Sequence, residues 1–484
     1  MTERAEHYIS FFPLFLTLLG VLAVLSGLLV SLFVSPAYVF GPMAVVLCVI
    51  SVLVRWPYGG LLGIVVASVL PHFSVVVGGW SARPEHCAVG LVLVAFLFRW
   101  VAGERPQIVL TKIDYYLVGY IGWNYVSSAL VSPHRALTLR WALLNSLVVL
   151  PYFLIKVIGS EQRVLRWLFK VFLGVGVAES AYCLISFAAH HALGSSFGVG
   201  VDQYSADVGG IYGTLYEPNL LGAYAGCLAI MLLVRYFVGS GHSRWLGVGF
   251  LISFWAMLVS LSRAALLGFA GLLIIMFLFG LRRGVIRPFR LIPLATVVAL
   301  FVVPVAPIAV PSLSERFQTL SLQRPEEDPD TVGRMVSYAA AIQDILRHPV
   351  LGNGTASFQL LGGLDYEAYL GSRPWVGNVL VRILHDTGLV GFVALGLFLG
   401  GIGLRAKEAL KLGGEAREMV LALSAGCLIY AISFQATDGT MLAFFWVHMG
   451  TLGAAVACAE SELSRMPRPE NGVGLEANRL PGRT

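Results

Sequence analysis

Four short stretches of this chain combine charged or amide side chains with glycine and proline inside an otherwise apolar sequence. They are GTLYEPNLLG at 213–222, SLSRAALLG at 260–268, the segment from Arg334 to HPVLGNG at 348–354, and GNVLVRILHDTGLVG at 377–391. A charged side chain inside or beside a membrane span is costly to insert, so each such residue predicts a function. We expect the four stretches to form one site.

Arginine is the cation that these stretches use, and arginine suits a diphosphate. Its guanidinium binds phosphate oxygens in a bidentate way and never loses its charge. Arginines can also stabilise a departing diphosphate in place of a metal, so we expect no metal and no cofactor. The residues predicted to bind the diphosphate or the attached substrate are Arg263, Arg334, Arg140, Arg382, Asn219 and Asn378.

A lipid that carries a sugar on a diphosphate would place its anionic head group at the depth of these arginines. Glycosyl transfer from such a lipid needs, besides the arginines, a general base for the attacking hydroxyl. That base must be a carboxylate or an imidazole, and the candidates are Glu217, His385 and Asp386. Structural roles compete with these functions, because an arginine at a span end can simply extend its head group to the interface. Glu179, in the middle of a span, either belongs to the site or neutralises Arg140 or Arg263.

The composition predicts the elements that must position these residues. The chain has 484 residues, of which 57% are hydrophobic and 12% charged, whereas an average soluble domain is ~25% charged. This balance excludes an ordinary soluble enzyme and a disordered chain. Its long apolar runs, without alternation, also exclude a membrane β-barrel. We predict an all-α polytopic membrane protein with about 12–14 transmembrane helices.

The candidate spans are each long enough for a hydrocarbon core of ~30 Å. They lie near 9–32, 37–54, 58–78, 86–102, 114–131, 139–158, 165–190, 217–238, 245–261, 263–281, 289–310, 378–403, 418–434 and 439–458. The segments 37–54 and 58–78 can instead form one re-entrant pair, because Pro71 and His72 interrupt the second segment. The re-entrant pair would lower the number of spans to the smaller predicted value.

Charge distribution predicts the orientation of these spans. With both termini in the cytoplasm, about two thirds of the 33 basic residues fall on the cytoplasmic side. The basic residues on the outer side are all arginines: Arg83, Arg135, Arg140, Arg263, Arg316, Arg324, Arg334, Arg347, Arg373 and Arg382. Basic residues stand at span ends and not on one face, so no nucleic-acid partner is expected.

Two long segments are expected on the outer side, near 191–216 and 311–377. In the second, Met335, Ala339 and Ile342 recur at helical spacing, which predicts an amphipathic helix on the outer membrane surface, ended by Pro349. The predicted units are N-terminal transmembrane helices (1–158), central transmembrane helices (159–310), a periplasmic loop with the surface helix (311–377), C-terminal transmembrane helices (378–458) and a disordered cytoplasmic tail (459–484).

The motifs resemble those of the O-antigen ligase/polymerase superfamily over about residues 210 to 400. SLSRAALLG resembles its S-R-G/A-A span start, and YEPNLLG resembles its P-N-x-x-G element. Arg334 followed by Pro349, Gly352 and Gly354 resembles the arginine helix and its PxxGxG stretch. Asn378, Asp386, Gly388 and Gly391 match its closing motif.

The resemblance implies a fold of the GT-C type and a metal-independent, inverting glycosyltransferase of the outer leaflet. Its donor would be a glycan on a polyprenyl diphosphate, held by Arg263 and Arg334, and its acceptor a glycan or a lipid. The ligase branch commonly carries a histidine before the asparagine that matches Asn378, but this chain has Gly377 there. This departure favours a polysaccharide polymerase, and favours Glu217 as the base.

The expected location is a bacterial inner membrane, with the active site on the periplasmic face. Further expected partners are the lipid bilayer and assembly proteins such as a chain-length regulator. Two alternatives stay open: an O-antigen ligase that transfers the glycan to a lipid or protein, and a lipid-linked glycan flippase or transporter. A transporter typically shows inverted repeats and broken helices at the bilayer midplane, whereas the charges here gather at one face.

Overall fold

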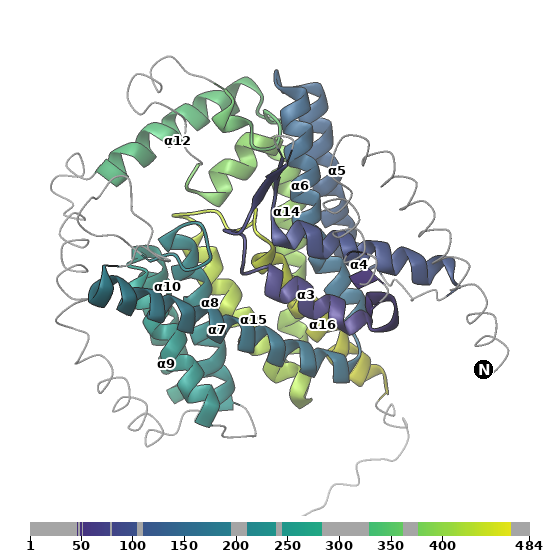
Figure 1. Cartoon of the computed structure of the whole chain (residues 1–484), viewed down its shortest axis with the longest axis vertical. Helices are drawn as coiled ribbons and strands as arrows, with labels where there is room; N and C mark the ends of the chain where they lie inside the picture. The colour runs from purple at the N-terminus through teal and green to yellow at the C-terminus, as the bar shows by residue number, and fades with distance from the viewer. Residues whose placement is uncertain are drawn as a thin grey trace, which may run out of the picture.

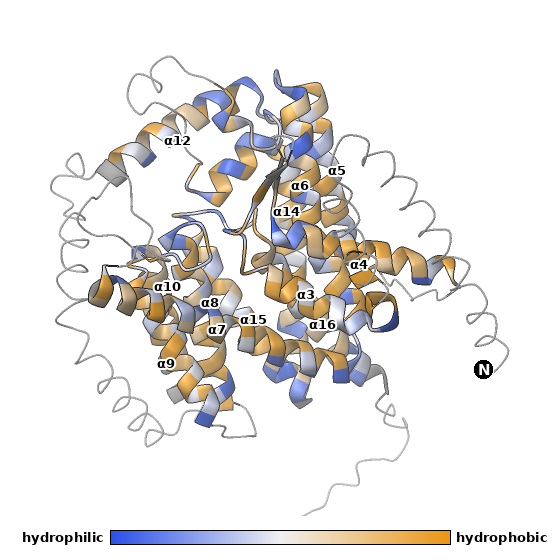
Figure 2. Cartoon of the chain, in the orientation of Figure 1, coloured by the Kyte–Doolittle hydropathy of each residue, from blue (hydrophilic) through white to orange (hydrophobic). Residues whose placement is uncertain are grey.

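The computed structural model of the chain is a bundle of helices (Figure 1). It describes residues 46, 49–50, 52–77, 80–103, 110–194, 211–238, 244–282, 329–361 and 376–465. Apart from one short hairpin, these residues form helices and their connections, which confirms the predicted all-α class. Hydrophobic residues run along the helices, and hydrophilic residues gather at helix ends and in loops (Figure 2).

In chain order, the described elements are α-helices, two short strands and one 3-10 turn. They are α3 (Pro57–Ala67), β1 (Val75–Val77), β2 (Trp80–Ala82), α4 (Pro84–Val101), α5 (Lys112–Leu130), α6 (Arg135–Ile158), α7 (Gln162–Leu193), α8 (Pro218–Val238), α9 (Arg244–Val259), α10 (Arg263–Arg282), α12 (Pro329–Arg347), the 3-10 turn η3 (Ser357–Gln359), α14 (Val379–Ala409), α15 (Gly414–Ser433) and α16 (Ala443–Arg465). The two strands are antiparallel, with Val76 opposite Ser81.

Seven helices within the described residues are long and apolar enough to cross a membrane: α4, α6, α7, α8, α14, α15 and α16. The segments Pro57–Ala67, Arg244–Val259 and Arg263–Met276 are shorter apolar helices. The chain is therefore a multi-pass membrane protein. Outside the described residues lie the predicted spans 9–32 and 289–310 and most of 37–54. The total of about 12–14 spans therefore stays a prediction.

The predicted span at 58–78 is wrong in its second half. Helix α3 ends at Ala67, and the chain then turns toward the loop that precedes α8. There the His72 amide donates to the Thr214 carbonyl at 3.1 Å, and the Thr214 hydroxyl donates to the Val69 carbonyl. Pro71 offers no amide hydrogen to continue a helix, and these contacts with Thr214 stabilise the turn instead.

Helix α8 is the centre of the bundle, because it is buried on nearly all sides. It packs against α7, α9, α10 and α15, while α16 packs against α6 and α14 against α5. A helix that is apolar around its whole circumference must be enclosed by other helices or lipid. Glycines allow close approach: a methyl group added at Gly226 would lie 3.0 Å from the Met257 sulfur.

Helix α12 lies obliquely to one side of the upright helices α5, α6 and α14 (Figure 1). It is fixed to the start of α14 by a small apolar cluster of Ala341, Phe358 and Val376. The helix ends two residues before Pro349, as predicted. Its outer face exposes large apolar side chains: Met335, Ile342 and Leu346, the last 73% exposed. An exposed apolar stripe on an amphipathic helix fits the predicted position on a membrane surface.

Ion pairs join α6 to α5 and α14 to α16, near the start of α5 and the C-terminal ends of the other three helices. Lys156 pairs with Asp114, which also accepts hydrogen bonds from the Tyr152 hydroxyl at 2.6 Å and the Thr111 amide at 2.6 Å. Arg405 binds Glu460 through both ends of its guanidinium, and one of these contacts is 2.9 Å. Only the Lys156–Asp114 pair is buried, and removing one partner of such a pair costs about 3–5 kcal/mol.

Candidate functional site

The structure brings the four sequence stretches into two directly contacting pairs, which a further loop joins. Stretch 213–222 packs on stretch 260–268, and the loop at 348–357 binds stretch 377–391. The loop at 434–442, between α15 and α16, connects the two pairs. In it, the Thr437 hydroxyl donates to Glu217, and Asp438 binds Arg382. The 434–442 loop was not part of the predicted site.

Helices α8 and α10 begin side by side at this site. Pro218 is the first residue of α8, where its missing amide hydrogen and fixed φ are tolerated, and the Glu217 carbonyl accepts the Leu220 and Leu221 amides. Ser262 precedes α10, and its carbonyl accepts the Leu266 amide at 3.0 Å. A methyl group at Gly222 would lie 2.5 Å from the Ser262 Cβ. The glycine of P-N-x-x-G is thus required for close packing beside Arg263.

Helix α14 is broken at Gly388, which has φ 61° and ψ −166°. The 348–357 loop fills the break. The Asn353 amide donates to the His385 carbonyl at 2.9 Å, and the Gly354 amide donates to the Asp386 carbonyl at 2.9 Å. After the break, the Leu389 amide donates to the Pro349 carbonyl at 2.9 Å. Non-helical backbone at membrane depth is tolerated only where protein satisfies its polar groups, and this loop does so.

Glycine is obligatory at this break for a steric reason. Gly352 has φ 79°, and a methyl group there would lie 2.4 Å from the Gly388 amide nitrogen. A methyl group at Gly388 would lie 2.4 Å from the Val350 carbonyl oxygen. Two stretches far apart in the sequence therefore touch backbone to backbone. The PxxGxG and DxGxxG patterns encode one structural unit, the broken helix and its inserted loop.

Helix α5 supplies the polar side chains that hold this unit. The Ser127 hydroxyl donates to the Asp386 carbonyl at 2.9 Å and accepts the Gly354 amide at 3.1 Å. The Thr355 hydroxyl donates to the Asn124 side chain at 2.9 Å. These polar side chains lower the hydropathy of α5, which lies at the predicted place but is not among the seven helices that are long and apolar enough to cross a membrane.

Arg382 lies in a buried charge network and does not face open space. Its exposed fraction is 2%. The guanidinium pairs with Asp438, lies 3.3 Å from Asp386, and donates at 2.7 Å to the Thr440 hydroxyl. Its donors are used within the protein, so we reassign Arg382 from diphosphate binding to positioning α14 against the 434–442 loop.

His385 and Asp386, two of the predicted bases, are also buried, each with an exposed fraction of 0%. The His385 Nδ1 atom lies 2.9 Å from Asp386, and its Nε2 atom lies 3.6 Å from Asp344 on α12. The other Asp386 oxygen accepts the Ala356 amide at 2.9 Å. A base must reach the proton that it removes. Their complete burial argues against that role, and we reassign both residues to positioning.

Glu217 is the predicted base whose position suits the role. It is half-buried at the N-terminus of α8, and its carboxylate accepts a hydrogen bond from Thr437. Beside it, the Arg83 guanidinium lies 5.9 Å from the centre of the Tyr216 ring and donates at 3.0 Å to the Met441 carbonyl. Arg83 is buried and forms an ion pair with the buried Glu85 at 3.2 Å, so it holds the 434–442 loop against the start of α4.

Arg334 lies half-buried on α12, beside Tyr338. In the described part of the chain it has no ion-pair partner. The Tyr338 hydroxyl donates to the Gly377 carbonyl at 3.4 Å, which directs this face of α12 toward the start of α14. Burial raises the pKa of Tyr338, and the nearby Arg334 charge opposes that shift, so the phenol stays protonated at neutral pH.

The remaining predicted residues stand at helix ends. Asn378 caps α14: its side-chain oxygen accepts the Leu380 and Val381 amides at 2.9 and 3.1 Å, so its main role is structural. Arg263 opens α10, Asn219 is in the first turn of α8, and Arg140 is in the second turn of α6; all three are half-buried. Glu179 accepts the Thr214 amide at 2.8 Å and thus fixes the loop before α8.

Residues 248–396 match a protein-family model described as O-Antigen ligase. This match supports the resemblance of the chain to the O-antigen ligase/polymerase superfamily. No curated protein matches the chain. The region that carries the superfamily match contains Arg263, Arg334 and the broken helix at Gly388, whereas Glu217 and Asp438 lie outside it.

Proposed function

We propose that this chain is a glycosyltransferase that polymerises oligosaccharide repeat units carried on a polyprenyl diphosphate, at the outer face of a bacterial inner membrane. The observation that carries the proposal is Arg334. It is a half-buried cation without an ion-pair partner among the described residues, one helical turn before Tyr338, whose hydroxyl contacts the Gly377 carbonyl just before α14. A cation held in this way is free to bind an anion.

Helix direction supports an anionic ligand at the same place. Helices α8, α10 and α14 all begin in the linked stretches that form the site. A helix N-terminus carries a partial positive charge and favours anions such as phosphate. Arg263 is the first residue of α10, so its charge adds to that of the helix end. The donor diphosphate would bind between Arg263 and Arg334.

In the proposed reaction, Glu217 accepts the proton of an acceptor sugar hydroxyl. The hydroxyl oxygen attacks the anomeric carbon of the donor on the face opposite the diphosphate. The bond from that carbon to the diphosphate oxygen breaks, and its electron pair remains on the diphosphate. Arg263 and Arg334 stabilise this developing charge. The new glycosidic bond has the inverted configuration, and no covalent enzyme intermediate forms.

Transfer of the glycan to a different acceptor, as in an O-antigen ligase, is the second candidate. The description of the matched model favours it. Against it, position 377 holds glycine, although a Cβ there would meet nothing closer than the Ala436 carbonyl at 3.7 Å. The backbone therefore leaves room for a Cβ at this position, but this chain carries no side chain there.

One assay separates these functions. The purified full-length chain is given a polyprenyl-diphosphate oligosaccharide, with and without a lipid acceptor. Longer lipid-linked glycans support polymerisation, whereas glycan found only on the added acceptor supports the ligase. If neither product forms and the donor crosses a liposome membrane, the chain is a flippase and the proposal fails. Product formation is expected to survive a metal chelator.

A further inference from the structure

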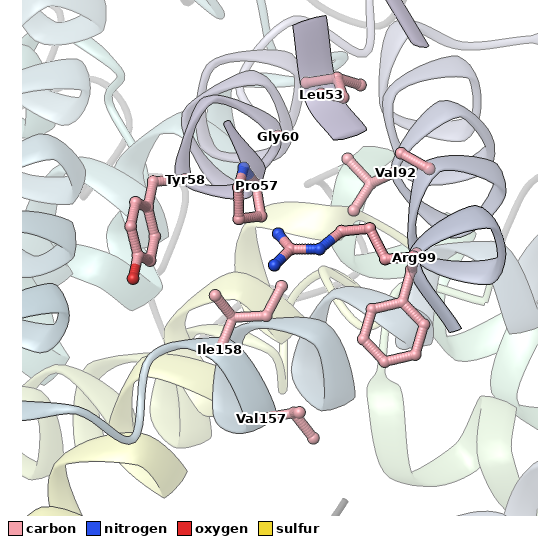
Figure 3. Close-up of a pocket in the computed structure, with 10 residues that line it drawn as sticks. Leu53, Pro57, Tyr58, Gly60, Val92, Arg99, Val157 and Ile158 are labelled. Atoms are coloured by element: carbon pink, nitrogen blue, oxygen red, sulfur yellow. The ribbon is translucent and has the colours of Figure 1, made fainter. Parts of the chain in front are cut away.

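A cavity of about 330 Å³ lies between α3, α4 and the C-terminal end of α6. This volume falls within the range of roughly 300–1,000 Å³ for small-molecule sites. Its walls are mainly apolar and include Leu53, Val92, Ala95 and Ile158. Figure 3 shows the Arg99 side chain reaching from α4 into this space, toward Pro57 and Ile158.

The cavity is remote from the candidate functional site. Arg83, which contacts the 434–442 loop, precedes the first turn of α4, and Arg99 is in the last turn. Sixteen residues of helix separate them by about 24 Å. The neighbouring end of α6 carries Lys156, and α7 starts there with Arg163. This is the basic end of the bundle, which the positive-inside rule assigns to the cytoplasmic leaflet.

Aromatic side chains mark the depth of the cavity in a membrane. Trp56, which precedes α3, is 50% exposed, and Trp100, which follows Arg99, is 52% exposed. Tyr58 lines the cavity itself and is partly exposed. Tryptophan and tyrosine concentrate where hydrocarbon meets head groups. The cavity therefore sits at the level of lipid head groups, with its apolar walls on the hydrocarbon side.

We propose that this cavity binds an anionic glycerophospholipid of the inner leaflet. The lipid phosphate would bind the Arg99 guanidinium, and part of an acyl chain would fill the space between Leu53, Val92, Ala95 and Ile158. An amphiphile of this kind matches both the cation and the apolar walls. Basic pockets between membrane helices on the cytoplasmic side bind anionic head groups for the same reason.

The test uses the purified full-length chain in detergent, with native mass spectrometry to count bound lipid. Phosphatidylglycerol is titrated against phosphatidylcholine, which has the same chains but no net charge. Arg99→Gln removes the cation and should weaken phosphatidylglycerol binding at least about tenfold. Arg99→Lys should retain most of it. Arg163→Gln is the matched control, because Arg163 is exposed at the same end of the bundle and outside the cavity lining.

A second variant tests the apolar part. Ala95→Phe should fill the cavity and displace the lipid without a change in charge; if it does not fold, Ala95→Leu replaces it. Inorganic phosphate alone should not compete with the lipid. The proposal is overturned if Arg99→Gln and wild type bind phosphatidylglycerol equally, if phosphatidylcholine binds as tightly, or if inorganic phosphate displaces the lipid, since the last result means a simple anion site.

Discussion

The Arg382 guanidinium and the Asp438 carboxylate form a buried ion pair that joins the first turns of α14 to the loop between α15 and α16. The same loop holds Glu217 through Thr437. One short loop thus connects the proposed base to the helix that carries the superfamily's closing motif. The geometry of the site depends on this pair, although neither partner faces open space.

Arg382→Gln should destabilise the protein by about 3–5 kcal/mol, because it leaves the buried Asp438 charge uncompensated. Asp438→Asn should cost less, because Arg382 keeps Asp386 as an ion-pair partner at 3.3 Å. The double variant should lose less than the sum, with a coupling of about 1–3 kcal/mol. Thermal unfolding of the four proteins in detergent measures this cycle. Strict additivity would mean that the two charges do not interact.

Gly388→Ala should lower the melting temperature, because it forces a side chain into a positive-φ position at a cost of about 1–3 kcal/mol. The added methyl group would also meet the Val350 carbonyl oxygen at 2.4 Å. Gly396→Ala is the matched control on the same helix, since nothing lies within 4 Å of its Cβ position. There alanine should stabilise α14 by about 0.5–1 kcal/mol. Equal effects at both positions would contradict the role of the broken helix.

Glu217→Gln should reduce the rate of glycan elongation by about 10²–10⁴, the usual contribution of a general base. Donor binding should be unchanged, because the side chain keeps its size and its hydrogen-bonding oxygen. His385→Gln should instead lower the melting temperature and the rate together, and leave the shape of the pH–rate profile as in wild type. If His385→Gln removes a limb of that profile while Glu217→Gln leaves the rate intact, the assignment of the base is reversed.

Much of the fold could be predicted from hydrophobicity alone. The helices from α4 to α10 and from α14 to α16 begin within a few residues of the predicted spans, since long apolar runs are a local signal. Helices α14 and α16 extend past their predicted ends, α16 to Arg465 and thus into the predicted disordered tail. Prolines marked the start of α8 and the stop after α12. Helix α3 was predicted too long, because the contacts that turn the chain at Ser68 come from Thr214, which lies far away in the sequence.

The site was only partly predictable for the same reason. Its four stretches could be found because each breaks an apolar run. The roles of Arg382, His385 and Asp386 could not, since a charged residue has the same appearance in the sequence whether it faces substrate or a buried partner. Asp438 was missed: it stands in a short loop without a motif, and its partner Arg382 belongs to another helix.

The orientation of the chain makes a separate prediction about sidedness. Cysteine introduced at Arg347, near the proposed site, should react in intact cells with a maleimide that cannot cross the inner membrane. Cysteine introduced at Lys411 should react only after the membrane is opened. Both side chains are more than half exposed, so both are accessible to the reagent. Cys87, which is exposed, must first be replaced. The opposite labelling pattern would place the proposed site in the cytoplasm.

The central claim is that Arg334 holds the donor diphosphate, and elongation of a polyprenyl-diphosphate oligosaccharide by purified variants tests it most directly. Arg334→Gln should lower the rate by about 10²–10³, the usual loss when one preorganised donor to a developing anion is removed. Arg347→Gln removes the same charge from an exposed position on the same helix and should leave the rate near that of wild type. If Arg334→Gln elongates glycan as fast as Arg347→Gln, Arg334 does not bind the diphosphate and the account is wrong.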